Sequence, residues 1–331
     1  MPSLKSMGGT GTTGGPAGRE RRAVAALGGN AFAARGGEIT MERQFAFARE
    51  ALACLGPLLA PPFELLLSHG NGPQVGHQLA RAERALGDAY PLPLDACVAQ
   101  TQGELGYVIG RTLRDLLAER GLARPVAVLV TEVEVDPADP AFRDPVKPVG
   151  PVLDEGGAAA LRARGATVRD DAGRGLRRMV PSPEPHRVLG VEVASRLLDE
   201  GALVVAAGGG GIPVVATPRG WRGVEAVVDK DLTAALLADE VAAGLLLLVT
   251  DVPCAYTDFR TPRQAPLGRL GAARARALLE EGHFEPGSMA PKIEACLRFA
   301  SRPGRRAVVC DPPSLAAALR GEAGTIVLPD G

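Results

Sequence analysis

Short, mainly apolar runs alternate with longer amphipathic stretches along the chain. The apolar runs cover residues 23–27, 63–67, 125–133, 202–207, 245–250, 306–310 and 325–328. The amphipathic stretches cover residues 41–59, 74–86, 96–120, 188–200, 231–240, 271–281 and the residues after 292. Strands that are buried on both faces give continuous apolar runs, whereas surface helices repeat apolar residues every three or four positions. The alternation therefore predicts an α/β fold, with a mainly parallel sheet and helices on both of its faces.

Two segments lack this pattern. Residues 1–20 are rich in Gly, Thr and Ser and have no apolar period, so we expect a disordered tail. Residues 136–185 are dense in Pro, Gly, Arg and Asp, and their regular segments are short. A structureless loop of that length is uncommon in a compact domain, so we interpret this segment as an inserted subdomain, or lid.

Charge and cysteine content narrow the class of protein. Lys plus Arg is 37 and Asp plus Glu is 38, so there is no basic excess to hold a nucleic-acid backbone, and any phosphate site must be local. No apolar run reaches the ~18–20 residues that span a bilayer, and no secretory signal is visible. The five cysteines are far apart and form no CxxC pair. We therefore expect reduced thiols in a cytoplasmic protein with neither nucleic-acid nor membrane partners.

Three of the expected strands end in glycine-rich turns. These turns are Gly28-Gly29-Asn30, Gly70-Asn71-Gly72 and Gly208-Gly209-Gly210-Gly211. Ligands of open α/β sheets bind beyond the carboxyl ends of the strands, and glycine lets the backbone approach a phosphate closely. One such turn could be a plain connection, but three together favour phosphate binding. The chain has no GxxxxGK[ST] loop, and Pro213 breaks the helix start that a dinucleotide fingerprint needs, so the predicted phosphate site is of another type.

Lysines supply the second chemical signal. Lys230 stands between Asp229 and Asp231, which would keep it protonated and fixed in place. Phosphoryl transfer needs such fixed positive charge on the migrating group. The alternative is a solvated charge cluster at a helix N-terminus, with Asp231 as the cap. Lys292 lies near the start of a predicted helix, where the dipole disfavours a cation unless an anion is nearby.

Other polar residues are less specific. Lys147 has a rigid frame of proline and glycine inside the irregular insert, which suits an anion clamp on a lid and equally suits an exposed loop. His69 precedes a glycine turn and could contact ligand or be structural. The other histidines have no partners that indicate a triad or a metal, so we predict no protein-built metal site.

Taken together, these motifs resemble the carbamate kinases of the amino-acid kinase superfamily. The matching blocks follow the order of that family and comprise residues 24–30, 68–76, 100–107, 133–137, 147–151, 177–183, 206–214, 223–231, 248–252 and 287–292. The resemblance implies an amino-acid kinase domain over residues 21–331, an open αβα sandwich with a protruding subdomain at about 137–187. It also implies a homodimer that transfers the γ-phosphoryl group reversibly between ATP and carbamate, with Mg²⁺, to give ADP and carbamoyl phosphate. In arginine metabolism such a reaction can run towards ATP or towards carbamoyl phosphate.

The resemblance also assigns residue roles. Lys230 and Lys292 match lysines that neutralise the transferring group, and Asp231 matches the carboxylate that orders them. Lys147 matches a lysine that reaches down from the protruding subdomain. The expected phosphate- and substrate-binding turns contain Gly28, Gly29, Asn30, Gly70, Asn71, Gly72, Gly209 and Gly210. The expected nucleotide-binding residues are Thr250, Asp251, Tyr256 and Met289.

Some positions depart from the pattern of that family. Ala290 replaces a glycine before Lys292, which could crowd the site, and Pro253-Cys254 alters the loop that leads to Tyr256. Two alternatives stay open, and these changes are hints only of the second. One is a related kinase that phosphorylates another small carboxylic acid. The other is a nucleotide-binding regulator without activity.

Overall fold

The computed structural model describes residues 21–28, 40–171 and 173–330. The expected disordered tail at residues 1–20, and Gly29 and Asn30 of the first glycine turn, lie outside the described residues. The order of the eight strands in the main sheet is β15-β17-β16-β12-β1-β2-β9-β3. Their bounds are β1 Arg22–Leu27, β2 Glu64–His69, β3 Val126–Val128, β9 Leu203–Val205, β12 Leu245–Val249, β15 Arg269–Gly271, β16 Arg306–Cys310 and β17 Thr325–Leu328. All neighbouring pairs are parallel except β16 with β17, which confirms the predicted mainly parallel sheet.

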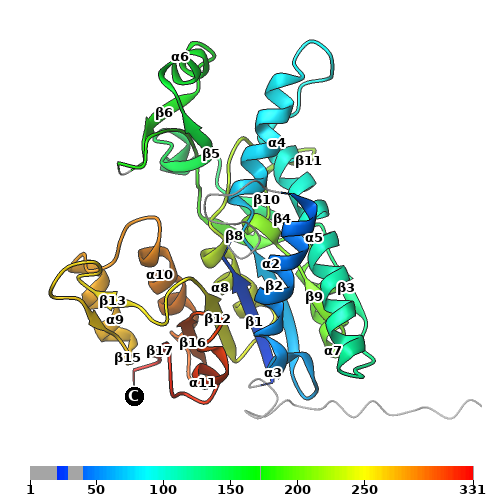
Figure 1. The fold of residues 1–331 in the computed structure, drawn as a ribbon, viewed down its shortest axis with the longest axis vertical. Helices are drawn as coiled ribbons and strands as arrows, with labels where there is room; N and C mark the ends of the chain where they lie inside the picture. The colour runs from blue at the N-terminus through cyan, green and yellow to red at the C-terminus, as the bar shows by residue number, and fades with distance from the viewer. Residues whose placement is uncertain (1–20, 29–39, 172, 331) are drawn as a thin grey trace, which may run out of the picture.

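Helices cover both faces of this sheet (Figure 1). Side chains alternate across a strand, so Val24 and Ala26 of β1 belong to one core cluster, and Ala23, Ala25 and Leu27 belong to the other. The first cluster is closed by α7 (Val191–Asp199), α8 (Lys230–Glu240), α9 (Ala272–Glu280) and α10 (Met289–Phe299). The second is closed by α2 (Met41–Ala53), α3 (Gly56–Leu59), α5 (Leu94–Glu119) and α11 (Leu315–Leu319). The result is an αβα sandwich, and none of the helices in the described part of the chain is long and apolar enough to cross a membrane.

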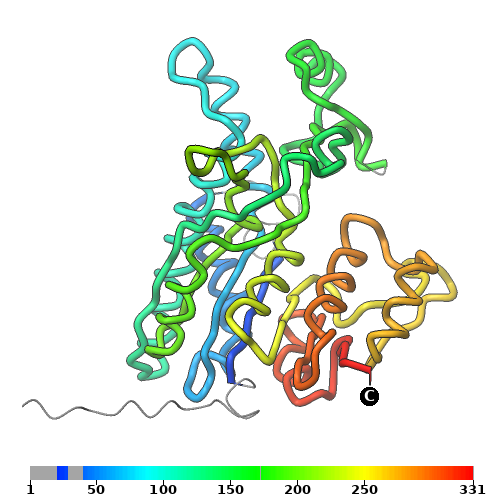
Figure 2. The backbone as a smooth tube through the Cα atoms, turned by 180° about the vertical axis from the view of Figure 1, so that it is seen from behind, coloured from blue at the N-terminus to red at the C-terminus, as the bar shows by residue number. Residues whose placement is uncertain are grey.

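Two smaller sheets lie beyond the carboxyl ends of the central strands. One has the order β11-β10-β4-β8, from Gly220–Gly223, Ile212–Thr217, Glu132–Val135 and Pro185–Val188. The other has the order β5-β7-β6, from Lys147–Leu153, Leu176–Val180 and Thr167–Asp170, and carries α6 (Glu155–Ala163). Figures 1 and 2 show this three-stranded sheet as a green lobe that stands apart from the main body; we call it the lid. The helix α4 (Gly72–Arg84) runs beside β5.

Several element predictions need correction. The helix predicted over residues 41–59 is two helices, because Pro57 cannot donate a backbone hydrogen bond and stands in the first turn of α3 instead. The strand predicted over residues 125–133 is also two, since the chain leaves the central sheet after β3 and enters the four-stranded sheet at β4. The helix expected after Lys292 begins earlier, at Met289. The remaining elements are the short β13 (Tyr256–Thr257) and β14 (Ala265–Pro266), and the 3₁₀ turns Pro140–Phe142 and Gly208–Gly210.

Candidate active site

A cavity of about 310 Å³ opens where three neighbouring parallel strands end. Strands β1, β2 and β12 lead directly into Gly28, Gly70 and Thr250, and their shared direction brings these residues together at one edge of the sheet. We call this space the lysine cavity. Of the residues singled out from the sequence, its lining contains Gly28, Gly70, Asn71, Gly72, Lys147, Gly209, Lys230, Asp231, Thr250, Asp251 and Lys292.

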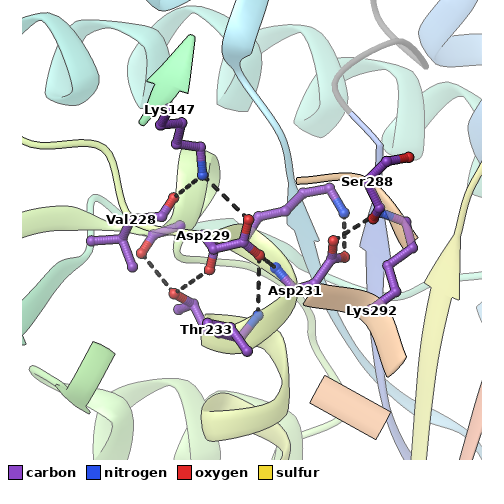
Figure 3. A network of polar contacts seen from close by, with 10 residues as sticks. Lys147, Val228, Asp229, Asp231, Thr233, Ser288 and Lys292 are labelled. Atoms are coloured by element: carbon purple, nitrogen blue, oxygen red, sulfur yellow. Dashed lines mark hydrogen bonds and ion pairs between the residues drawn. The ribbon is translucent and has the colours of Figure 1, made fainter. Parts of the chain in front are cut away.

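Two lysines share one buried carboxylate in this cavity (Figure 3). Asp231, in the first turn of α8, is 3% exposed, and its Oδ1 lies 2.5 Å from Lys230 Nζ. Its Oδ2 accepts a hydrogen bond of 2.9 Å from Lys292 Nζ, which comes from the first turn of α10. Lys292 also donates to the carbonyl oxygen of Ser288 at 3.4 Å. Two helices that start 59 residues apart in the sequence thus place two ammonium groups on the same acceptor.

The charges in this triad are strongly coupled. Burial disfavours the ionised form of Asp231, but the two lysines outweigh it and hold the pKa of that carboxyl well below its usual range. Burial lowers the pKa of Lys230, as does repulsion from Lys292, although Asp231 opposes both. For Lys292 burial also acts to lower the pKa, but Asp231 and the other nearby carboxylates raise it. The carboxylate is therefore ionised and holds two cations at the cavity wall.

Asp229 caps the helix that carries the triad. Its Oδ1 accepts from the backbone N–H of Asp231 at 2.9 Å and of Leu232 at 3.4 Å, so the alternative with Asp231 as the cap is wrong. Lys147 Nζ reaches down from β5 of the lid to Asp229 Oδ2 at 3.3 Å and to the carbonyl oxygen of Val228 at 3.1 Å. Burial opposes ionisation of Asp229, but Lys147 and the backbone donor lower its pKa. Lys147 is thus directed into the cavity and is not a solvated loop residue.

The glycines at this edge permit close backbone packing. Gly209 has φ +69°, and a Cβ atom added to it would lie 2.2 Å from Asn71 Nδ2, which donates to Thr101 Oγ1 at 2.8 Å. Gly210 lies behind the cavity wall instead of lining it: its added Cβ would meet the carbonyl oxygen of Val228 at 2.5 Å, and its own carbonyl accepts from Thr233. The third glycine turn therefore lets Asn71 and the residues before α8 pack closely against it.

His69 is a structural residue. Its side chain is buried, and Gly208 leaves so little space that an added Cβ would lie 2.3 Å from His69 Nε2. Burial lowers the pKa of His69 to about 4, although a hydrogen bond with the carbonyl of Gly70 opposes this shift. The imidazole is therefore neutral at physiological pH and is not among the residues that line the lysine cavity.

A second cavity of about 510 Å³ adjoins the first and shares Thr250, Asp251 and Ser288 with it. We call it the outer cavity. It contains Tyr256 and Met289, which the resemblance assigns to nucleotide binding, and the ring of Tyr256 lies 5.7 Å from that of Phe259. Sequence reasoning missed the other lining residues, which are Arg174, Val252, Phe259, Arg260, His283, Phe284, Glu285 and Ser288. Apart from Arg174, they lie in the irregular stretch after β12 or just before α10, where no periodicity marks them.

The positions that depart from the carbamate-kinase pattern affect the cavities little. Ala290 lies in the first turn of α10, packs against the first core cluster and is not among the described residues that line either cavity. Cys254 is buried beside the outer cavity, while Tyr256 still lines it.

A signal for the site was present in the composition. The whole chain contains only four lysines, Lys5, Lys147, Lys230 and Lys292, against 33 arginines. Three of these four line one cavity. Arginine supplies nearly all other basic side chains, so lysine is used here where a compact ammonium charge is needed.

Fixed ammonium groups and glycine turns at the carboxyl edge of a parallel sheet are what phosphoryl transfer requires of a protein. The model of the Amino acid kinase family matches residues 21–311. Carbamate kinase of Pyrococcus horikoshii is 40% identical over 93% of this chain and 99% of its own length, and that of Thermococcus kodakarensis is 42% identical over the same shares. The structure of carbamate kinase from Giardia lamblia bound to AMP-PNP superposes with a TM-score of 0.86 at 33% identity, covering 95% of this chain and all of the other. The chain belongs to the amino acid kinase family and, within it, to the carbamate kinases.

Proposed function

We propose that this chain transfers the γ-phosphoryl group reversibly between ATP and carbamate, giving ADP and carbamoyl phosphate, with Mg²⁺ bound to the nucleotide. The observation that carries the proposal is the pair of lysines held on Asp231 at the carboxyl edge of the sheet. The adjoining outer cavity, with the neighbouring rings of Tyr256 and Phe259, supports nucleotide binding next to that pair. The Giardia relative that binds AMP-PNP supports the same assignment.

The chemical step is an in-line attack of a carbamate oxygen on the γ-phosphorus. Carbamate is already an anion, so the step needs no general base, and the buried, neutral His69 is not required for it. Charge spreads over the equatorial oxygens of the transferring group, where Lys230 and Lys292 stabilise it. Asp231 keeps both ammonium groups in place before the substrates arrive, so little reorganisation is needed during the reaction.

The lid and the glycine turns hold the acceptor. Lys147 adds a third ammonium group on the side opposite Lys292 (Figure 3). The backbone N–H of Gly72, at the start of α4, supplies a donor to the anionic groups of the substrates. The N–H groups of Gly28 and Gly70 donate to the carbonyl oxygens of Val249 and Leu27, and these two glycine turns let the substrates approach the backbone closely. We assign phosphate and carbamate binding to these turns, and nucleotide binding to Thr250, Asp251, Tyr256 and Met289.

Magnesium fits this cavity as a companion of the substrate. Among the described residues no group of three His, Cys, Asp or Glu side chains could hold a metal ion, and Asp229 and Asp231 are engaged by lysines. Mg²⁺ is usually bound by one or two carboxylates together with substrate phosphates and water. Asp251, at the junction of the two cavities, would contribute that carboxylate. The ion would neutralise phosphate charge.

We further propose a homodimer in the cytoplasm that acts in arginine metabolism. The full-length similarity to the named carbamate kinases supports this proposal. All five cysteines are free and four are buried, which suits a reducing compartment. Sedimentation of the purified protein would test the assembly, since a monomer at working concentration contradicts it.

The test is ATP formation from ADP, Mg²⁺ and carbamoyl phosphate, compared between wild type, Lys230→Ala and Lys292→Ala. Losing one donor to a developing oxyanion costs about 2.7–4 kcal/mol, so each variant should lose about 10²–10³ in kcat. Lys5→Ala is the matched control and should keep wild-type turnover. A folded Lys230→Ala protein with near-native turnover contradicts the assignment of that lysine. Wild type that binds AMP-PNP but gives no ATP contradicts the carbamate reaction, and a screen of other carboxylic acids with ATP then distinguishes a different acceptor from an inactive binder.

A further inference from the structure

The turn between β6 and β7 of the lid reaches the outer cavity. Arg174 in this turn is one of its lining residues, although it lies more than 70 residues before every other residue that lines that cavity. Its Nη2 atom is 3.8 Å from Asp171 Oδ1 and 3.8 Å from Glu285 Oε1, and its Nε donates to the carbonyl oxygen of Asp171 at 3.3 Å. Both Nη contacts are longer than a hydrogen bond. Within the described residues, the Nη2 atom of Arg174 thus makes no hydrogen bond, and it lies at the mouth of the cavity.

The same turn is tied to the lysine of the lid. Asp171 Oδ2 accepts from Arg177 Nη1 at 3.0 Å, and Arg177 Nη2 donates to the carbonyl oxygen of Gly150 at 2.7 Å. Gly150 lies three residues after Lys147 on β5. The three-stranded sheet therefore carries Arg174 towards the outer cavity and Lys147 into the lysine cavity as parts of one hydrogen-bonded unit.

We propose that Arg174 is a nucleotide-binding residue, which donates from the lid to the phosphates of ATP and ADP. This inference rests on the proposed function in assigning a nucleotide to the outer cavity. The rings of Tyr256 and Phe259 offer a surface for the base, and the transferred group must lie at the triad. The intervening phosphates then pass the residues that both cavities share, below the lid.

The chemistry of the side chain agrees with this role. A guanidinium presents a planar fork that matches two phosphate oxygens, whereas an ammonium offers only a point charge. The alternative is that Arg174 only bridges to Glu285. That contact is long, and the two side chains are 64% and 46% exposed, so an ion pair there contributes little. A bound polyphosphate offers a more highly charged partner than the single carboxylate of Glu285.

The test measures binding of adenosine, AMP and ADP to the full-length protein by calorimetry in the presence of Mg²⁺. Arg174→Ala should weaken the binding of ADP about tenfold, which is the lower end for the loss of a hydrogen bond to a charged group. The same variant should leave the affinity for adenosine nearly unchanged. Arg174→Lys should recover part of the loss for ADP. Arg169→Ala is the matched control, because Arg169 is an exposed lid arginine that pairs with Asp144 at 2.6 Å, and it should bind ADP like wild type.

If Arg174→Ala loses equal affinity for adenosine and ADP, or loses affinity for neither, the proposal is overturned. A Glu285→Gln variant that loses as much ADP affinity as Arg174→Ala would also overturn it, since the bridge between the two side chains would then explain the effect. These measurements require no turnover. A wild type that binds ADP but makes no ATP from carbamoyl phosphate would therefore contradict the proposed reaction and leave the role of Arg174 to be decided by the binding data.

Discussion

Replacing Asp231 by Asn removes the charge that holds the triad together and changes its shape little. The side chain of Asp231 is 5% exposed, and those of Lys230 and Lys292 are 13% and 12% exposed. In the variant, two ammonium groups converge on a neutral amide in a space that water reaches poorly. Asp231→Asn should therefore lower both the stability of the fold and the activity.

The magnitude follows from the contacts. At the 2.9 Å separation of Lys292 Nζ and Asp231 Oδ2, an effective dielectric constant of 20 gives an attraction of about 6 kcal/mol before desolvation is subtracted. Removing one partner of a buried pair typically costs about 3–5 kcal/mol, because the other charge stays buried without compensation. We expect a loss in that range for Asp231→Asn. Adding Lys292→Met removes one of the two stranded charges, so the double variant should regain part of the stability but no activity.

The assay is urea unfolding followed by far-ultraviolet circular dichroism, with ATP formation measured on the same samples. Because the pKa of Asp231 is depressed in the folded protein, its contribution to stability is present above its usual value of 3.8 and is lost as pH falls below that value. Asp231→Asn should therefore flatten the acid side of the stability profile as well. An unchanged unfolding midpoint, or a double variant less stable than Asp231→Asn, would refute this account of the triad.

Three further predictions concern two closely packed glycines and one buried carboxyl group. Gly209→Ala should lower the free energy of unfolding by more than about 1 kcal/mol and remove most of the activity, because φ at this position is positive and the added Cβ would clash with Asn71. Urea unfolding and ATP formation measure these two effects. Gly76→Ala places a Cβ 2.4 Å from Gly150 Cα, which should push β5 away and destabilise by about 1–3 kcal/mol; steady-state kinetics should show a raised KM for carbamoyl phosphate. Burial raises the pKa of Glu240 from 4.5 to about 7, so the folded state binds its proton more tightly and stability falls as pH rises from 4.5 through about 7; Glu240→Gln should remove that slope in urea midpoints.

Gly103→Ala is the matched control for the two glycine variants. A Cβ at Gly103 would meet nothing within 4 Å on the exposed side of α5, so activity should be kept and stability should rise by up to about 1 kcal/mol. If it loses as much activity as Gly209→Ala, the close contacts do not explain the loss. A Glu240→Gln profile with the wild-type slope would mean that another group titrates in that window.

The strands of the central sheet could be predicted from the sequence because they are buried on both faces. Every residue of β12 is apolar, and β1 is apolar after its first residue. The order of the strands was not readable, since β1 pairs with β12 more than 200 residues away and no local pattern encodes that choice. The boundary between β3 and β4 was missed for a related reason: the apolar run continues through residues 129 and 130 although the chain changes sheets there.

The candidate site was partly readable. Glycine turns after parallel strands must meet at one edge of the sheet, so the convergence of Gly28 and Gly70 follows from the fold class. The different roles of Asp229 and Asp231 do not follow from the fold class, because both residues flank Lys230 symmetrically in the sequence. They are decided by where α8 begins: the residue before the helix caps it, and the residue in its first turn faces α10. The residues of the outer cavity were harder to predict, since its walls come from irregular segments and from the lid.

The scarcity of lysine has a practical consequence. Acylating reagents and aldehydes attack primary amines and spare guanidinium groups. In this chain the only such amines besides the α-amino group are those of Lys5 and of the three lysines in one cavity. Apart from the α-amino group and Lys5, amine-directed labelling would therefore report on a single internal surface. Attachment of the protein to amine-reactive supports through that surface would inactivate it. Conjugation through exposed arginines is the gentler route for this molecule, since four of its five cysteines are buried.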